Sequence, residues 1–220
     1  MKKNTNDKAI IFDLDGTLIN SLEDIALCAN IVLKEFNLPS HEIDAYRNFL
    51  GGGALFLIKN CMPKNSSDEM IEKVLERFKI VYDNEQHMNT KPYEGIYELL
   101  KELKEKGIKV GVLSNKPHYF TCKYVEEFFS SLKLDEVHGQ KEEVPKKPHP
   151  IGASKIANSF GIACENIFFV GDSDVDMNTA KNAKMIAVGV EWGFRGPDEL
   201  VEHGAKHIVK TPQDILNLFK

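Results

Sequence analysis

Short apolar runs alternate with amphipathic helical segments through most of this chain, and few folds accommodate such an order. The runs are continuous, as is typical of strands that are buried on both faces of a parallel sheet. Strands are expected at residues 9–12, 108–113, within 166–174, at 185–190 and at 207–209. Helices are expected near 92–107, 119–131, 150–160 and 197–203, with two more that begin near 175 and 212. This order predicts an α/β fold in which helices cover a parallel sheet on both faces.

Residues 20–86 interrupt the alternation, because the sequence shows only helical periodicity there. Apolar residues recur at helical spacing within 22–36 and again within 71–82. Ser21 directly precedes the first of these segments and is a candidate N-cap. The whole block follows the first strand immediately, so we expect an insertion into the α/β domain and not a tandem domain.

The length of 220 residues allows one large core and a second small one. The predicted organisation is a Rossmann-like core formed by residues 1–19 and 87–220, with a small all-helical domain at 20–86 inserted into it. The sequence leaves open whether the protein is a monomer or a homodimer.

The net charge and the cysteine content limit which binding partners and which cellular compartment we expect for this protein. The formal net charge of −5 argues against sequence-independent binding of nucleic acid, which requires a basic face, but it does not exclude a small anionic substrate. No apolar run is long enough to cross a membrane, and the first one is too short for a signal peptide. The four cysteines show no C-x-x-C spacing, which is typical of small apolar residues in a reducing compartment. We therefore expect a cytoplasmic protein.

Three of the expected strands end in polar residues: FDLDGT at 12–17, LSNK at 113–116 and VGDSDVD at 170–176. Ligands of open α/β sheets bind at the carboxyl ends of the strands, so these three segments are expected to converge. The segment PKKPHP, at 145–150, is a loop that could deliver a lysine to the same place.

The residue types in these segments suit phosphoryl chemistry. Asp13, Asp15 and Asp172 would repel one another without a cation, and carboxylate oxygens are the ligands that Mg²⁺ prefers. A carboxylate can attack phosphorus to form an aspartyl-phosphate, while Ser114 and Lys147 would contact the phosphoryl oxygens. Each segment alone has a structural interpretation as an ordinary turn, loop or solvated charge pair. The four together favour a catalytic site.

The motifs D-x-D-G-T, S-N, K-P and G-D-S-x-x-D, in this order, resemble those of the haloacid dehalogenase superfamily of phosphohydrolases, and the helical insertion resembles the cap of that superfamily. The resemblance implies that Asp13 is the nucleophile and Asp15 the general acid/base. It implies that Mg²⁺ is held by the Asp13 carboxylate, the Asp15 main-chain carbonyl and Asp172, and that Asp176 holds metal-bound waters or Lys147. The implied phosphate-binding residues are Thr17, Ser114, Asn115 and Lys147.

The segment RNFLGGG, at 47–53, resembles the cap of phosphoglycolate phosphatases, as does the C-terminal segment GVEWGFRGPDEL. This resemblance implies a small phosphorylated metabolite, 2-phosphoglycolate first, with Arg47, Gly52 and Gly53 as substrate contacts. Whether Arg47 or Arg195 reaches the substrate is left open, and a flexible interhelical turn is an equal interpretation of the glycines.

Related branches of the same superfamily remain alternatives: a β-phosphoglucomutase-like phosphomutase, a pyrophosphatase and a nucleotide or sugar phosphatase. A true dehalogenase would need no Mg²⁺ and no second acid at position 15. A phosphate-accepting receiver domain is a further alternative, but it is typically far shorter and has no helical insertion.

Overall fold

The computed structural model describes residues 8–85 and 88–220, which form two compact units. One unit contains the chain up to Ile19 together with Pro92–Lys220, and the other contains Asn20–Lys91. The boundary that the sequence suggested, between residues 86 and 87, lies outside the described residues.

The larger unit is built on a six-stranded sheet in which every pair of neighbouring strands is parallel. The strands follow one another across the sheet as β5 (Glu136–Gln140), β4 (Lys109–Pro117), β1 (Ala9–Phe12), β6 (Ile167–Gly171), β7 (Ile186–Val190) and β8 (His207–Val209). All residues of β1 and β6 are buried, as expected for continuous apolar runs at the centre of such a sheet. The predicted α/β class is confirmed.

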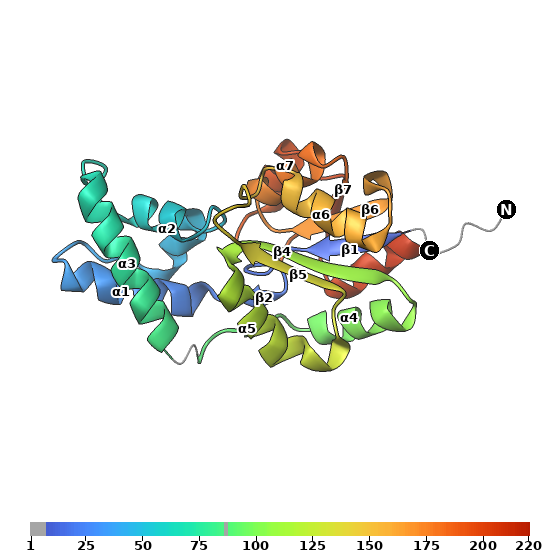
Figure 1. The fold of residues 1–220 in the computed structure, drawn as a ribbon, viewed down its shortest axis with the longest axis horizontal. Helices are drawn as coiled ribbons and strands as arrows, with labels where there is room; N and C mark the ends of the chain where they lie inside the picture. Colours follow the sequence, from blue (N-terminus) through green and yellow to red (C-terminus); the bar gives the residue numbers. More distant parts are fainter. Residues whose placement is uncertain (1–7, 86–87) are drawn as a thin grey trace. The chain divides into compact units, whose positions relative to one another are not determined.

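Helices lie on both faces of this sheet (Figure 1). One face carries α4 (Ile96–Glu105) and α5 (His118–Phe129), and the other carries α6 (Ile151–Phe160) and α7 (Asp174–Asn182). Further helical segments in the described part of this unit are η3 (Ser130–Leu132), η4 (Cys164–Asn166), α8 (Pro197–Glu202) and η5 (Pro212–Phe219). Ile11 and Phe169 of the central strands pack with Ile156 of α6 and Met177 of α7 in one hydrophobic core.

Strand β5 was not predicted from the sequence. It is an edge strand, and each of its residues is half-buried, so it lacks the continuous apolar run by which the central strands are recognised. Its partner β4 is also longer than predicted, because it continues through Ser114, Asn115 and Lys116 to Pro117, which pairs with Gln140 of β5. The polar residues of LSNK therefore belong to a strand and not to a loop.

The smaller unit is helical, as predicted. It consists of α1 (Leu22–Glu35), η2 (Ile43–Phe49), α2 (Ala54–Cys61) and α3 (Asp68–Asn84). Ser21 is the N-cap residue of α1, as predicted, but its side chain makes no capping hydrogen bond to that helix, and the N–H of Leu22 donates instead to Oδ1 of Asn20 at 3.3 Å. Two very short strands, β2 (Ile19–Asn20) and β3 (Lys91–Pro92), pair where the chain passes between the units.

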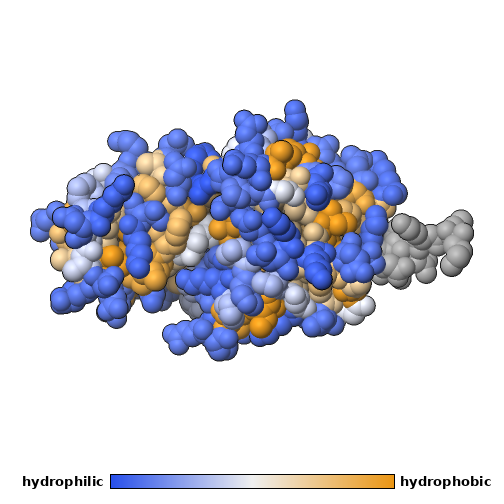
Figure 2. All heavy atoms as spheres, turned by 90° about the horizontal axis from the view of Figure 1, so that it is seen from above, coloured by the Kyte–Doolittle hydropathy of each residue, from blue (hydrophilic) through white to orange (hydrophobic). Residues whose placement is uncertain are grey.

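The face of the molecule in Figure 2 is mostly hydrophilic, with small separate apolar areas. Within the part of the chain that the structure describes, no helix combines the length and the apolar character needed to cross a membrane.

Candidate active site

Three neighbouring strands bring the predicted polar segments together. Asp13 and Asp15 follow β1, Ser114 lies near the end of β4, and Asp172 follows β6, and β1 lies between the other two strands in the sheet. Ligand oxygens of Asp13, Asp172 and Asp176 all lie within 4.8 Å of one another, and the three residues are buried. The carboxyl ends of parallel strands thus form one buried acidic cluster, which is the kind of place where open α/β sheets bind ligands.

The turn after β1 separates the two aspartates. The N–H of Asp13 still pairs with the carbonyl of Val170 in β6, at 2.9 Å, so this carboxylate stays at the end of the sheet. The carbonyl of Leu14 then accepts the N–H groups of Thr17 and Leu18 at 3.2 and 2.9 Å. This tight turn leaves the Asp13 side chain 9% exposed and the Asp15 side chain 18% exposed, so the second carboxylate has more access to solvent.

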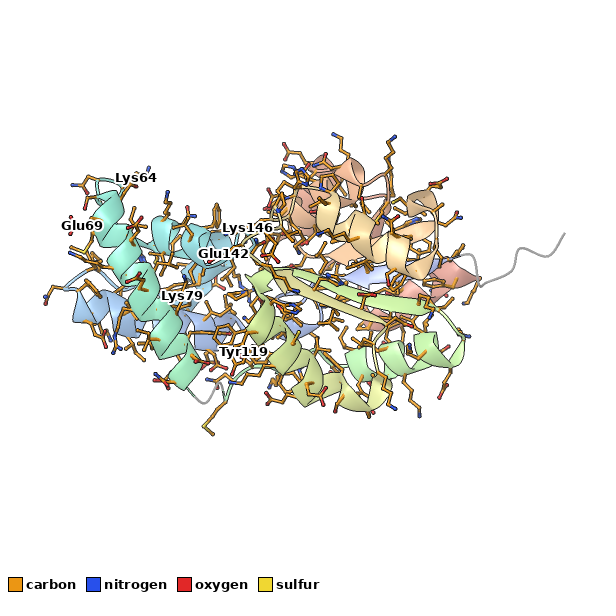
Figure 3. The ribbon with its side chains drawn as sticks, in the orientation of Figure 1. Lys64, Glu69, Lys79, Tyr119, Glu142 and Lys146 are labelled. Atoms are coloured by element: carbon orange, nitrogen blue, oxygen red, sulfur yellow. The ribbon has the colours of Figure 1, made fainter. Side chains whose placement is uncertain are left out.

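Lys147 is the lysine that enters the cluster. Its Nζ lies 2.7 Å from Oδ1 of Asp13 and 2.7 Å from Oδ1 of Asp176, and its side chain is buried. Asn115 holds the loop that carries it, because the amide accepts the Lys147 N–H at 2.9 Å and donates to the Lys147 carbonyl at 3.0 Å. The neighbouring Lys146, labelled in Figure 3, is exposed. Of the two lysines in PKKPHP, therefore, Lys147 belongs to the site.

Asp176 has its carboxylate engaged at both oxygens. Besides the Lys147 contact at Oδ1, its Oδ2 accepts the N–H and the hydroxyl of Ser173 at 3.1 and 2.7 Å, in a capping box at the start of α7. This residue therefore anchors the lysine and the helix, which is one of the two roles expected for it.

Asp172 is held by groups from two loops. Its Oδ2 accepts the main-chain N–H of Phe194 at 2.7 Å, and its Oδ1 lies 3.5 Å from the hydroxyl of Thr17. The same C-terminal loop contacts the first motif, since the indole N–H of Trp192 donates to the carbonyl of Thr17 at 3.0 Å. The loop at 192–194 was not predicted as part of the site, because main-chain donors carry no sequence signature.

Burial dominates the electrostatics of the cluster. It raises the pKa of Asp13 to about 7, with a further contribution from the charge of Asp176 that Lys147 partly offsets. Burial likewise raises the pKa of Asp172 well above its ordinary value, with Asp176 and Asp13 adding to the effect. For Lys147 burial acts against the charge, but the carboxylates of Asp13 and Asp176 outweigh it and raise its pKa. The lysine is therefore charged, and the carboxylates need more positive charge nearby.

The donor set fits a divalent cation. The ammonium groups of Lys116 and Lys147 pair with the carboxylates of Asp13, Asp15 and Asp176, and Asp172 adds a fourth carboxylate. One divalent cation would balance four negative charges against these two positive ones. Buried carboxylate oxygens suit a hard cation such as Mg²⁺. Since Asp176 is engaged by Lys147 and Ser173, Asp13 and Asp172 are the side chains suited to ligate it.

Lys116 is a site residue that the sequence did not reveal. Its Nζ lies 3.1 and 3.3 Å from the two carboxylate oxygens of Asp15. It is the last residue of LSNK, and a lysine after a polar pair at a strand end is indistinguishable, from sequence, from a solvated surface lysine.

The predicted substrate contacts of the insertion lie in the helical unit. Arg47, on η2, pairs with Asp44 at 2.7 Å, and its side chain is 39% exposed. Gly52 is covered by the ring of Phe56, since a Cβ added at position 52 would lie 2.4 Å from that side chain. Gly53 directly precedes α2. In the larger unit, Arg195 bonds Glu199 at 3.1 Å. A contact of any of these residues with substrate stays a prediction.

Comparison with known proteins adds an independent line of evidence. A family model described as haloacid dehalogenase-like hydrolase matches residues 10–190. The phosphoglycolate phosphatase of Mannheimia succiniciproducens is 34% identical over 222 residues, covering 98% of this chain and 99% of that protein. That of Aquifex aeolicus is 32% identical over 215 residues, covering 92% and 99%. A crystal structure of a Lactobacillus delbrueckii protein, provisionally named a phosphoglycolate phosphatase, has a TM-score of 0.92 at 29% identity and covers 97% of this chain and 98% of that chain. These matches confirm the resemblance that the motifs indicated. The chain belongs to the haloacid dehalogenase-like hydrolases.

Proposed function

We propose that this protein is a Mg²⁺-dependent phosphatase that hydrolyses 2-phosphoglycolate, a small phosphomonoester, through an aspartyl-phosphate. The observation that carries the proposal is the Asp13 carboxylate at the end of β1, buried beside Lys147 and Asp172. Such a phosphoryl transfer uses a nucleophilic carboxylate, a positively charged side chain held in place and a pair of carboxylates that can bind a metal ion.

The first half-reaction transfers the phosphoryl group to the enzyme. Asp13 attacks phosphorus, forming a carboxylate O–P bond while the bond to the leaving oxygen breaks, and Asp15 donates a proton to that oxygen. Lys147 holds Oδ1 of Asp13 at 2.7 Å and so restricts rotation of the attacking carboxylate. Asp13, Asp172 and the Asp15 main-chain carbonyl would hold Mg²⁺, which would offset charge on the phosphoryl oxygens.

The second half-reaction regenerates the enzyme. Asp15, now ionised, takes a proton from water as the water oxygen attacks phosphorus, and the bond between phosphorus and Asp13 breaks. Inorganic phosphate leaves, and Asp13 and the proton on Asp15 are restored. Thr17 and Ser114, both buried at the strand ends, are proposed to donate hydrogen bonds to the phosphoryl oxygens in both steps.

The choice of substrate rests on the helical insertion and on the relatives. Proteins named phosphoglycolate phosphatase match this chain over nearly its whole length. We propose that the helical unit acts as a cap in which Arg47 and the N–H groups at Gly52 and Gly53 bind the carboxylate of the substrate. Such contacts recognise the end of the molecule remote from phosphorus, so they would act mainly on kcat/KM.

Phosphate release tests the chemistry. Purified protein should release inorganic phosphate from phosphomonoesters with Mg²⁺ and lose this activity in excess EDTA. D13N should abolish both turnover and phosphoenzyme, because an amide is a poor nucleophile. Full activity in EDTA, or near-normal turnover by D13N, would refute the proposed mechanism.

A substrate panel tests the specificity in the same assay. We expect kcat/KM for 2-phosphoglycolate to exceed the values for pyrophosphate, hexose phosphates and nucleoside monophosphates. A tenfold preference for one of the others, about 1.4 kcal/mol in the transition state, would overturn the substrate and leave the phosphatase proposal intact. Conversion of a hexose phosphate to its isomer would indicate a phosphomutase.

A further inference from the structure

The paired lysine at the end of β4 has no role in the mechanism described so far. Lys116 is 7% exposed, and its Nζ reaches both carboxylate oxygens of Asp15, at 3.1 and 3.3 Å. A buried ammonium group is costly unless a partner compensates it, and a fork to both oxygens restrains the carboxylate more than a single contact would. The pair therefore joins the end of β4 to the turn after β1.

The surroundings of Lys116 restrain both ends of its side chain. At the backbone, its N–H donates to the hydroxyl of Ser114 at 3.1 Å and its carbonyl accepts the hydroxyl of Thr121 at 3.2 Å. At the other end, Nζ lies 5.1 Å from the centre of the Tyr124 ring, and that ring is buried. A cation over an aromatic face gains further attraction. The ammonium group is thus held at a defined place beside Asp15.

We propose that Lys116 is a positioning residue: its Nζ donates to the oxygen of the Asp15 carboxyl group that carries no proton, and so holds the other oxygen in the orientation needed for proton transfer to the leaving oxygen of the substrate. This inference rests on the proposed function, in which Asp15 is the general acid/base. Asp15 stands on a turn and is the more exposed of the two aspartates, so packing restrains it less than it restrains Asp13. Proton transfer requires heavy atoms within hydrogen-bond reach and well aligned, which a freely rotating carboxylate provides only part of the time.

Substrates with different leaving groups can distinguish positioning of Asp15 by Lys116 from a general electrostatic effect of the Lys116 charge. An alkoxide, such as the one released from 2-phosphoglycolate, is strongly basic and requires protonation as the bond breaks. The p-nitrophenolate ion is far less basic and leaves without it. The value of kcat/KM reports the steps up to the first irreversible one, which is phosphoryl transfer to Asp13. Loss of Asp15 orientation should therefore lower kcat/KM for an alkyl ester and spare the aryl ester.

The test compares K116M with wild type on 2-phosphoglycolate and p-nitrophenyl phosphate, in Mg²⁺. General acid catalysis contributes about 10² to 10⁴-fold, so we expect K116M to lower kcat/KM for the alkyl ester about tenfold or more and for the aryl ester less than about threefold. K116R keeps a cation but moves it, and should show the same split if K116M does not fold. K123M removes an equal charge from an exposed position of α5 and should change neither value.

A double-mutant cycle completes the test. If Lys116 acts through Asp15, adding K116M to D15N should leave both kcat/KM values within about twofold of D15N alone. An equal loss on the two esters in K116M, or a further loss in the D15N background, would overturn the positioning role and leave the proposed phosphatase intact. Absence of phosphate release by the wild-type protein from any phosphomonoester would overturn both.

Discussion

Two glycines make room for the Asp172 carboxylate. A Cβ added at Gly16, whose φ is +86°, would lie 2.2 Å from Oδ2 of Asp172, and one added at Gly193 would lie 2.2 Å from its Cβ and 2.6 Å from the carbonyl of Gly16. The backbone therefore approaches this carboxylate from two loops, and the N–H of Phe194 then bonds it. The side chain that we propose as a metal ligand is oriented by main-chain atoms, which cannot adopt other rotamers.

The substitution G193A should weaken Mg²⁺ binding, because the added methyl group must displace Asp172 or the turn at Gly16. Loss of such supporting contacts typically costs about 10 to 100-fold in metal affinity or activity. We would measure the Mg²⁺ concentration that gives half-maximal phosphate release, together with the thermal shift caused by Mg²⁺. G196A is the matched control, since a Cβ there meets nothing within 4 Å. Wild-type values for G193A would show that the close approach does not orient Asp172.

A buried aspartate links the two ends of the helical unit by hydrogen bonds. Asp24, in the first turn of α1, accepts two hydrogen bonds from Thr90, from the N–H and the hydroxyl, both at 2.6 Å. It also accepts the amide of the Asn89 side chain at 2.9 Å and the Asn89 N–H at 3.1 Å. One charged side chain thus joins the beginning of the unit to its end, and an acid in the first turn also interacts favourably with the helix dipole.

We expect D24A to lower the free energy of unfolding by about 2 to 3 kcal/mol, because it leaves the buried N–H and hydroxyl of Thr90 without their charged acceptor and removes the two bonds from Asn89. Urea denaturation monitored by circular dichroism measures this loss. E23A, an exposed acid in the same helical turn, is the matched control and should change stability by less than about 0.5 kcal/mol. An equal effect of the two substitutions would mean that the dipole, and not the link to residues 89–90, accounts for the stabilisation.

The acidic cluster couples stability of the protein to pH and to a bound cation. Burial, then the charge of Asp176, raises the pKa of Asp13 from 3.8 to about 7 in the folded state, despite the opposing effect of Lys147. Between these two values the unfolded chain has released a proton that the folded protein still holds. Without a cation, deprotonation therefore favours the unfolded state, and the free energy of unfolding attributable to this group falls as the pH rises through the window.

A divalent cation should reverse that loss, because it binds the ionised carboxylates and only in the folded state. We expect Mg²⁺ to raise the melting temperature more at pH 8, where Asp13 is ionised, than at pH 5, where it is protonated. Thermal denaturation in Mg²⁺ and in EDTA at both pH values measures the difference, with NaCl of equal ionic strength as control. A larger gain at pH 5 would contradict the pKa assigned to Asp13.

Local patterns in the sequence were sufficient for the class of fold and for the motifs of the candidate site. The apolar runs of β1 and β6 are recognisable because both strands are buried on both faces. The edge strand β5 was missed, since its residues are only half-buried and its place depends on pairing with β4.

The positions of the polar groups within the site depended on contacts between distant segments. The sequence left open whether Asp176 would hold Lys147, and it could not show that Lys116 would reach Asp15 or that the N–H of Phe194 would bond Asp172. The physical reason is that the apolar pattern of a helix or strand reflects which of its own residues are buried, and this can be read from one segment. The contacts of a hydrogen-bonded site depend instead on which strand ends become neighbours in the folded protein. The sequence determined the elements and the residue types at their ends, and only the tertiary structure decided which charges meet.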